Sequence, residues 1–219
     1  MNYLYFISLL LIIFLSFYTF HIRNNCPKTI KGIVTIVTVM IILRMATLMF
    51  TFVKRSISYM GYFKYTYYLN FIYIPIIIAT VFFILWRNSK LKSSRLVVVL
   101  IISVISYLII LLINKPIVEI FTDYKMGYVI NFNVPITEFY YGFINIIAFA
   151  FIMKFLLNAK DTNGVLIVVA ASLLSLAEVA LIFGFGAYMP QPLMGEVLWV
   201  VALERCVESF KENARVYKK

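Results

Sequence analysis

The stretch Tyr67–Trp86, YYLNFIYIPIIIATVFFILW, decides the fold class of this chain. It runs for 20 residues without a charged side chain, and a helix of about 20 residues crosses the ~30 Å hydrocarbon core of a bilayer. The stretch also carries Asn70 near its start and Pro75 inside it. A proline is tolerated in a membrane helix where neighbouring helices satisfy the carbonyl that it leaves unbonded. We therefore predict a helix inside a bundle, with its polar N-terminal end facing a partner helix or a cavity.

The composition of the whole chain agrees with a lipid environment. Apolar residues make up 63% of the sequence and charged residues 13%, whereas soluble domains have about 25% charged residues. The apolar residues form continuous runs, which predict helices; membrane strands would show short alternating segments. The net charge of +11 comes from Lys and Arg in short loops beside these runs, so we do not expect nucleic-acid binding. The sequence predicts an all-α, polytopic helix bundle in the plasma (cytoplasmic) membrane, with the lipid bilayer as its main partner.

Seven apolar segments predict seven transmembrane helices. The predicted spans are residues 3–20, 33–53, 67–86, 96–113, 137–157, 165–187 and 193–210. The first lacks the basic start and the cleavage site of a signal peptide, so we expect a retained helix. The connection 114–136 is rich in aromatics and is expected at the membrane interface. We divide the chain into a transmembrane domain, residues 1–203, and a cytoplasmic helical tail, residues 204–219.

Loop charges predict the orientation. With seven spans and the N-terminus outside, the inner loops and tail hold 14 Lys and Arg residues and the outer loops hold 5. Cytoplasmic loops of membrane proteins carry the excess of Lys and Arg. This bias predicts an outside N-terminus and a cytoplasmic C-terminus.

The sequence carries no enzyme or metal motif that we recognise. It has no HExxH, GxSxG or Walker pattern, and its single histidine, His21, lies in a loop. The two cysteines, Cys26 and Cys206, lie near the ends of different segments and do not form a disulfide framework. We therefore expect no catalytic residue, no metal site and no cofactor.

Two ionisable residues fall inside predicted spans, where each is costly unless it is paired or hydrated. Arg44 lies in the second span and Glu178 in the sixth. Counted from the inner ends of their spans, they lie ~17 and ~20 Å deep at 1.5 Å per residue. Because these depths match, we predict that Arg44 and Glu178 pair. The alternative to a functional pair is an ion pair that only sets the register of the helices.

Further polar residues recur at helical spacing on the outer halves of three spans. The third span presents Asn70 and Tyr73, and the other two present a second group. That group is Glu138, Tyr141 and Asn145 in the fifth span and Ser175 in the sixth, beside Glu178. With Arg44, these residues predict a polar pocket in the outer half of the bundle that binds a small or lipid-like ligand. The alternative is hydrogen bonding between helices.

The C-terminal tail continues the last span with a regular apolar spacing. The spacing is 4, 3, 4 and 3 residues over Leu203, Val207, Phe210, Ala214 and Tyr217. This a/d pattern, without Pro or Gly, predicts one helix that leaves the membrane with a seam for a partner. The partner could be a second copy in a homodimer, a cytoplasmic signalling protein or the bilayer interface.

Three features resemble a known membrane region. They are FKYTYYLNFIYIPIIIATVFFIL in the third span, NKPIVEIF after the fourth span and the aromatic Phe139–Tyr141 opening the fifth. Together with the spacing of the spans, they resemble the N-terminal seven-helix region of bacterial sensor histidine kinases. The resemblance implies a sensor coupled through its last helix to a cytoplasmic output. The sequence ends about where that family's dimerisation helix and kinase domain begin, so we expect a partner to supply any output.

Three hypotheses about function follow. The first is a stand-alone membrane sensor or regulatory subunit that acts on a partner through its C-terminal helix. The second is a small transporter or permease component, in which Arg44 and Glu178 line a path for a substrate or proton. The third is a scaffold or immunity-type protein without a ligand. Helices broken at related positions would favour transport.

Overall fold

A computed structural model describes residues 2–53, 60–86, 94–114, 116–120, 128–132, 135–155, 162–185 and 191–216 of the chain. The first half contains α1 (Asn2–Ile22), η1 (Arg23–Asn25), α2 (Lys28–Val53), α3 (Met60–Tyr67), α4 (Asn70–Leu85) and α5 (Ser94–Ile113). The second half contains β1 (Ile117–Ile120), β2 (Tyr128–Asn131), α6 (Ile136–Phe155), α7 (Thr162–Phe185) and α8 (Met194–Val216).

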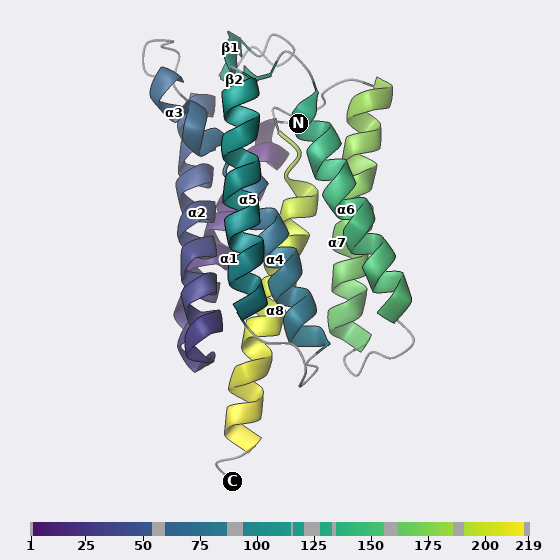
Figure 1. Cartoon of the computed structure of the whole chain (residues 1–219). Coiled ribbons are helices and arrows are strands. Elements are labelled where there is room, and N and C mark those ends of the chain that lie inside the picture. Colours follow the sequence, from purple (N-terminus) through teal and green to yellow (C-terminus); the bar gives the residue numbers. More distant parts are fainter. Residues whose placement is uncertain are drawn as a thin grey trace.

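The long helices form one bundle and run roughly along a common axis (Figure 1). The start of α1, the short α3 and the β1–β2 hairpin lie at one end of this bundle, which we call the hairpin end (Figure 1). The last helix, α8, starts inside the bundle and extends beyond its opposite end (Figure 1). It packs against α1, α4 and α7, so it is the central element of the described structure.

Six helical stretches among the described residues are long and apolar enough to cross a membrane. They cover residues 3–25, 28–52, 61–85, 94–113, 136–154 and 163–184. Large apolar side chains on the outer surface of α1, α5 and α6 are exposed, as expected where lipid replaces water around a protein. The prediction of a multi-pass helical membrane protein is confirmed. The predicted seventh span corresponds to α8, which is not among these six stretches.

The third predicted span is interrupted, but not at its proline. The structure has two helices, α3 and α4, separated at Tyr68 and Leu69. Pro75 lies inside α4, where it cannot donate to the carbonyl of Phe71 four residues earlier. The Tyr140 hydroxyl of α6 donates to that carbonyl over 2.8 Å. A neighbouring helix therefore satisfies the freed backbone group, as the sequence predicted.

The connection between the fourth and fifth spans contains a hairpin that the sequence analysis did not predict. Strands β1 and β2 pair antiparallel, with Ile117 opposite Asn131. Tyr68, at the break between α3 and α4, donates its hydroxyl proton to the carbonyl of Ile130 and stacks on Phe132 with ring centroids 4.4 Å apart. The hairpin is thereby attached to the interrupted helix at the hairpin end of the bundle.

Candidate functional site

The first turn of α8 lies inside the bundle, against the side of α7. The Glu178 carboxylate accepts hydrogen bonds from the backbone N–H groups of Met194 at 2.9 Å and Gly195 at 2.8 Å. Glu178 precedes the last residue of α7, Phe185, by seven positions, or about 11 Å at 1.5 Å per residue. A carboxylate at this place satisfies two orphan N–H groups and the positive end of the helix dipole. Glu178 is therefore the N-terminal cap of α8, supplied by a different helix.

The second residue of α8 allows this close approach because it has no side chain. A β-carbon placed on Gly195 would lie 2.1 Å from Ser175 Oγ and 2.8 Å from Ser175 Cα. The second of these contacts is to backbone, which cannot rotate away. Gly195 and Ser175 thus determine how closely α7 and α8 pack at the level of Glu178.

A buried ion pair lies one residue further along α8. The Arg44 guanidinium of α2 approaches the Glu196 carboxylate of α8 to 2.6 Å, with side-chain exposures of 0% and 1%. Tyr73 of α4 joins them, because its hydroxyl accepts from Arg44 Nη1 at 2.7 Å and donates to Glu196 at 2.9 Å. Arg44 Nη2 also donates to Gln191, at 3.3 Å. We call Arg44, Tyr73, Gln191 and Glu196 the ionic cluster.

The break between α3 and α4 supplies the remaining acceptor for Arg44. At this break Phe71 N–H bonds to the carbonyl of Tyr68 at 3.1 Å, in place of the Tyr67 carbonyl that a continuous α-helix would use. The Tyr67 carbonyl is then available, and Arg44 Nε donates to it over 2.8 Å. The guanidinium therefore joins three elements, α2, the α3–α4 break and α8, at one point.

Two acceptor atoms beside the cluster are not used by the described residues. Asn70 Oδ1 and Glu196 Oε1 are both buried without a close hydrogen-bond donor among the described residues, and the Asn70 side chain is itself a hydrogen-bonding neighbour of the Glu196 carboxylate. A buried polar atom without a partner is costly, and a bound water or another small donor commonly supplies the bond. A further donor at this side of the ionic cluster would satisfy both atoms.

A second polar group lies where α6, α7 and α8 meet. The Trp199 indole N–H donates to Asn145 Oδ1 over 2.9 Å, and the Asn145 amide donates to the Tyr141 carbonyl over 2.8 Å. The Tyr141 and Ser175 hydroxyls share a hydrogen bond of 3.1 Å. These side chains are fully or almost fully buried and bond to one another. This arrangement matches the interpretation as hydrogen bonds between helices, and ligand binding by these residues stays a prediction.

The predicted site residues are thus brought together around the start of α8, with one exception. Arg44, Asn70 and Tyr73 lie on the α2–α4 side, and Tyr141, Asn145, Ser175 and Glu178 lie on the α6–α7 side. Glu138, in the first turn of α6, is half-buried and forms no side-chain hydrogen bond with either group in the described part of the chain.

The predicted pair of Arg44 with Glu178 is wrong, because Glu196 is the acidic partner of Arg44. The depth argument compared only the second and sixth spans and did not consider the acidic residue at the start of the seventh. The structure places the start of α8 at the level of Glu178, which carries Glu196 to the depth of Arg44. Glu196 was the one charged residue in an apolar run, so its cost in lipid was the signal that could have identified it. Gln191 had no comparable signal.

The apolar seam of the tail is mostly covered by the chain itself. The helix continues without interruption to Val216, as predicted for this part of the tail. Leu203 and Val207 are, however, buried in the core of the bundle, and Phe210 is half-buried against it. The expectation that Leu203 and Val207 need a partner is therefore wrong, because α8 packs on α1 and η1. The side chains of Ala214 and Tyr217 lie outside the described residues.

A cavity lies in the half of the bundle away from the hairpin end, between α4, α5 and α6. It has a volume of about 810 Å³, an apolar lining and one charged residue, Arg95. This cavity was not predicted from the sequence, because the polar residues that predicted a pocket lie in the opposite half of the bundle.

Within the described ranges, no group of three or more His, Cys, Asp or Glu side chains is arranged to hold a metal ion. No protein-family model, curated protein or solved structure matches the chain.

Proposed function

We propose that this protein is a membrane-embedded sensor or regulatory subunit. It binds a small or lipid-like ligand among its helices and acts on a cytoplasmic partner through α8. The observation that carries this proposal is the course of α8, which begins at the buried ionic cluster and continues to Val216, beyond the other helices (Figure 1). The resemblance to the membrane region of sensor histidine kinases supports the same function.

The ionic cluster is the physical link in this proposal. Arg44 ties α2 and the α3–α4 break to Glu196 on α8. Breaking a buried ion pair leaves an uncompensated charge, so the cluster strongly favours one register of α8. A ligand that shifts α4 would change the position of Tyr73 and with it the contacts of Glu196. The first turn of α8 would then move relative to α2, and the end of α8 would move with it.

The proposed topology has the N-terminus outside and the C-terminus in the cytoplasm. Since α8 starts about 11 Å below the end of α7, about 19 Å of a ~30 Å core remain for it to cross. At 1.5 Å per residue it leaves the core after about 13 residues, near Val207. The charged residues Glu208, Lys211 and Glu212 follow directly. The seventh segment thus crosses only part of the membrane.

Distances between spin labels test the coupling of the cluster to α8. The labels are placed at His21→Cys, at the end of α1, and Ser209→Cys, on α8, in a Cys26→Ala/Cys206→Ala chain in lipid nanodiscs. Glu196→Gln removes the charge that α8 contributes to the ionic cluster, and we expect a shifted or broadened distance distribution. Ser172→Ala, which removes a buried hydroxyl that donates to the Val168 and Val169 carbonyls of the same helix, is the matched control and should leave the distribution unchanged. An unchanged distribution in Glu196→Gln would contradict the proposal.

A small transporter is the second candidate function, because two helix discontinuities meet at the ionic cluster. The break between α3 and α4 and the internal start of α8 both lie at Arg44. Transporters use such interrupted helices for substrate and ion sites near the bilayer centre. The open acceptors Asn70 Oδ1 and Glu196 Oε1 fit a donor such as a proton-carrying group.

Proteoliposomes that contain a pH-sensitive dye separate the two functions. Protein-dependent proton flux under a membrane potential, abolished by Arg44→Met, would favour transport. Absence of flux together with a movement of α8 in the spin-label experiment would favour the sensor.

A further inference from the structure

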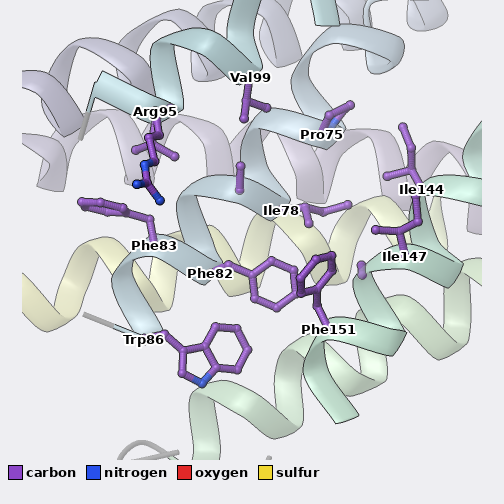
Figure 2. Close-up of a pocket in the computed structure, with 13 residues that line it drawn as sticks. Pro75, Ile78, Phe82, Phe83, Trp86, Arg95, Val99, Ile144, Ile147 and Phe151 are labelled. Carbon is purple, nitrogen blue, oxygen red and sulfur yellow. The ribbon is translucent and has the colours of Figure 1, made fainter. Parts of the chain in front are cut away.

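The cavity between α4, α5 and α6 has the length of one lipid leaflet. Its lining follows α4 from Pro75 to Trp86 (Figure 2). These positions are 11 residues apart, which corresponds to about 17 Å of helix. The hydrocarbon core of a bilayer is ~30 Å thick, so one leaflet contributes about 15 Å. The cavity therefore matches a single acyl chain aligned with the helices.

The apolar walls of the cavity and its position beside a peripheral helix suit an acyl chain. Phe82 and Phe151 lie close together in its wall, and Ile78, Ile144 and Ile147 continue the apolar surface (Figure 2). The volume of about 810 Å³ lies in the range of ligand-binding pockets, roughly 300–1,000 Å³. One wall is α5, a peripheral helix of which only Leu96, Ser103 and Tyr107 are buried. A lipid could reach the cavity sideways from the bilayer past this helix.

A positive charge marks the end of the cavity that lies away from the hairpin. Arg95, in the first turn of α5, is exposed, and its guanidinium extends over the cavity toward Phe83 (Figure 2). Within the described part of the chain no acidic side chain forms an ion pair with it. A phosphate is the natural partner of an arginine at this level, and basic pockets at the cytoplasmic face bind anionic headgroups.

We propose that this cavity binds an anionic phospholipid of the adjacent leaflet. One acyl chain fills the space along α4, and the headgroup phosphate lies at Arg95. The end of the acyl chain would reach Pro75 of α4, two residues from Tyr73 of the ionic cluster. A lipid in the cavity would therefore contact α4, the helix whose Tyr73 hydroxyl donates to Glu196. The binding of the lipid does not depend on the proposed function. The further claim that this lipid is the ligand that the protein senses rests on that function.

The two tryptophans of the chain provide a direct test. Trp86 lines the cavity, whereas Trp199 is fully buried in the core and acts as a constant background. The protein is placed in nanodiscs of unlabelled phosphatidylcholine. In two separate titrations, increasing amounts of brominated phosphatidylglycerol or of brominated phosphatidylcholine are added. Bromine atoms on the acyl chains of the added lipid quench tryptophan fluorescence. The proposal expects half-maximal quenching of Trp86 at a mole fraction of brominated phosphatidylglycerol about fivefold lower than that of brominated phosphatidylcholine, the effect of one basic residue near the surface.

Three variants assign this selectivity to the site. Arg95→Gln should bring the two midpoints together, because it removes the charge at the headgroup. Lys154→Gln, at the exposed end of α6 and outside the cavity lining, is the matched control and should keep the difference. Ala79→Phe fills the cavity from α4 and should remove the high-affinity quenching; its circular dichroism spectrum verifies that it is folded.

Equal midpoints for the two lipids in the unchanged chain would overturn the proposal, as would a difference that survives Arg95→Gln. The same titration with the spin labels at His21→Cys and Ser209→Cys separates this proposal from the proposed function. Selective quenching without any movement of α8 would leave the lipid site standing and contradict the role of this lipid as the ligand that the protein senses.

Discussion

The Arg44 guanidinium donates to the Glu196 carboxylate over 2.6 Å across the centre of the bundle, and neither side chain reaches solvent. The two residues are separated by 152 positions in the chain. The contact depends on the internal start of α8, because a helix that began at the membrane surface would leave Glu196 near that surface, short of the level of Arg44. The ion pair and the Glu178 cap are therefore parts of one arrangement.

Removal of one member of the pair should cost more than removal of both. Arg44→Met and Glu196→Met each leave a buried charged group without its partner, and we expect each to lower the free energy of unfolding by about 3–5 kcal/mol. The double variant Arg44→Met/Glu196→Met should lose less than either single variant. Equilibrium unfolding in detergent micelles by added SDS measures these differences.

The matched control is Glu208→Gln in the exposed Arg205–Glu208 pair, whose atoms are 3.8 Å apart. We expect a change of about 0–1 kcal/mol there. If the double variant of the buried pair loses the sum of the single losses, the two residues do not stabilise each other.

The hydroxyl of Tyr140 and the proline at position 75 should be energetically coupled. Tyr140→Phe leaves the Phe71 carbonyl without its donor, which should cost about 1 kcal/mol. Pro75→Ala restores a backbone N–H that can reach the same carbonyl, so Tyr140→Phe should cost close to nothing in that background. A double-mutant cycle of unfolding free energies measures the coupling. An equal cost of Tyr140→Phe in both backgrounds would show that the hydroxyl does not compensate for the proline.

Two glycines should respond differently to the same substitution. The β-carbon of Gly195→Ala would meet the Ser175 backbone of α7 at 2.8 Å, so we expect a loss of about 1–3 kcal/mol from overpacking. A β-carbon on Gly184, in α7, meets nothing within 4 Å, and its replacement by Ala should stay within about 0.5 kcal/mol. Thermal unfolding in detergent compares the two variants. Similar stability of both would mean that α7 and α8 are further apart at this point.

The proposed orientation predicts which loops a membrane-impermeant maleimide reaches in intact cells. Tyr62→Cys, on the exposed side of α3, should be labelled from outside, whereas Ser89→Cys should react only after the membrane is permeabilised. The native cysteines contribute little background, because both are buried and burial raises the pKa of the Cys26 thiol to about 11, which keeps it protonated at pH 7. Labelling of Ser89→Cys in intact cells would reverse the topology.

Much of the local structure could be predicted from the sequence by itself. The long apolar runs identify six of the membrane helices, because the length of an apolar run and the thickness of a bilayer are directly comparable. The prediction that a neighbouring helix satisfies the carbonyl freed by Pro75 is confirmed through Tyr140. The uninterrupted helix from Leu203 to Val216 is also confirmed, since no Pro or Gly interrupts it.

Only the tertiary structure decided which polar residues meet. Arg44 was identified as a buried charge in need of a partner, but its partner depends on the relative depth of α2 and α8, which no single segment contains. The break before Asn70 and the coverage of Leu203 and Val207 likewise depend on neighbouring helices. An apolar run specifies that a helix lies in the membrane, because both lipid and the packed interior of a bundle favour apolar side chains. It leaves open the height at which the helix begins and the side that it turns to its neighbours, and these are determined by the bonds that the buried polar groups form with one another.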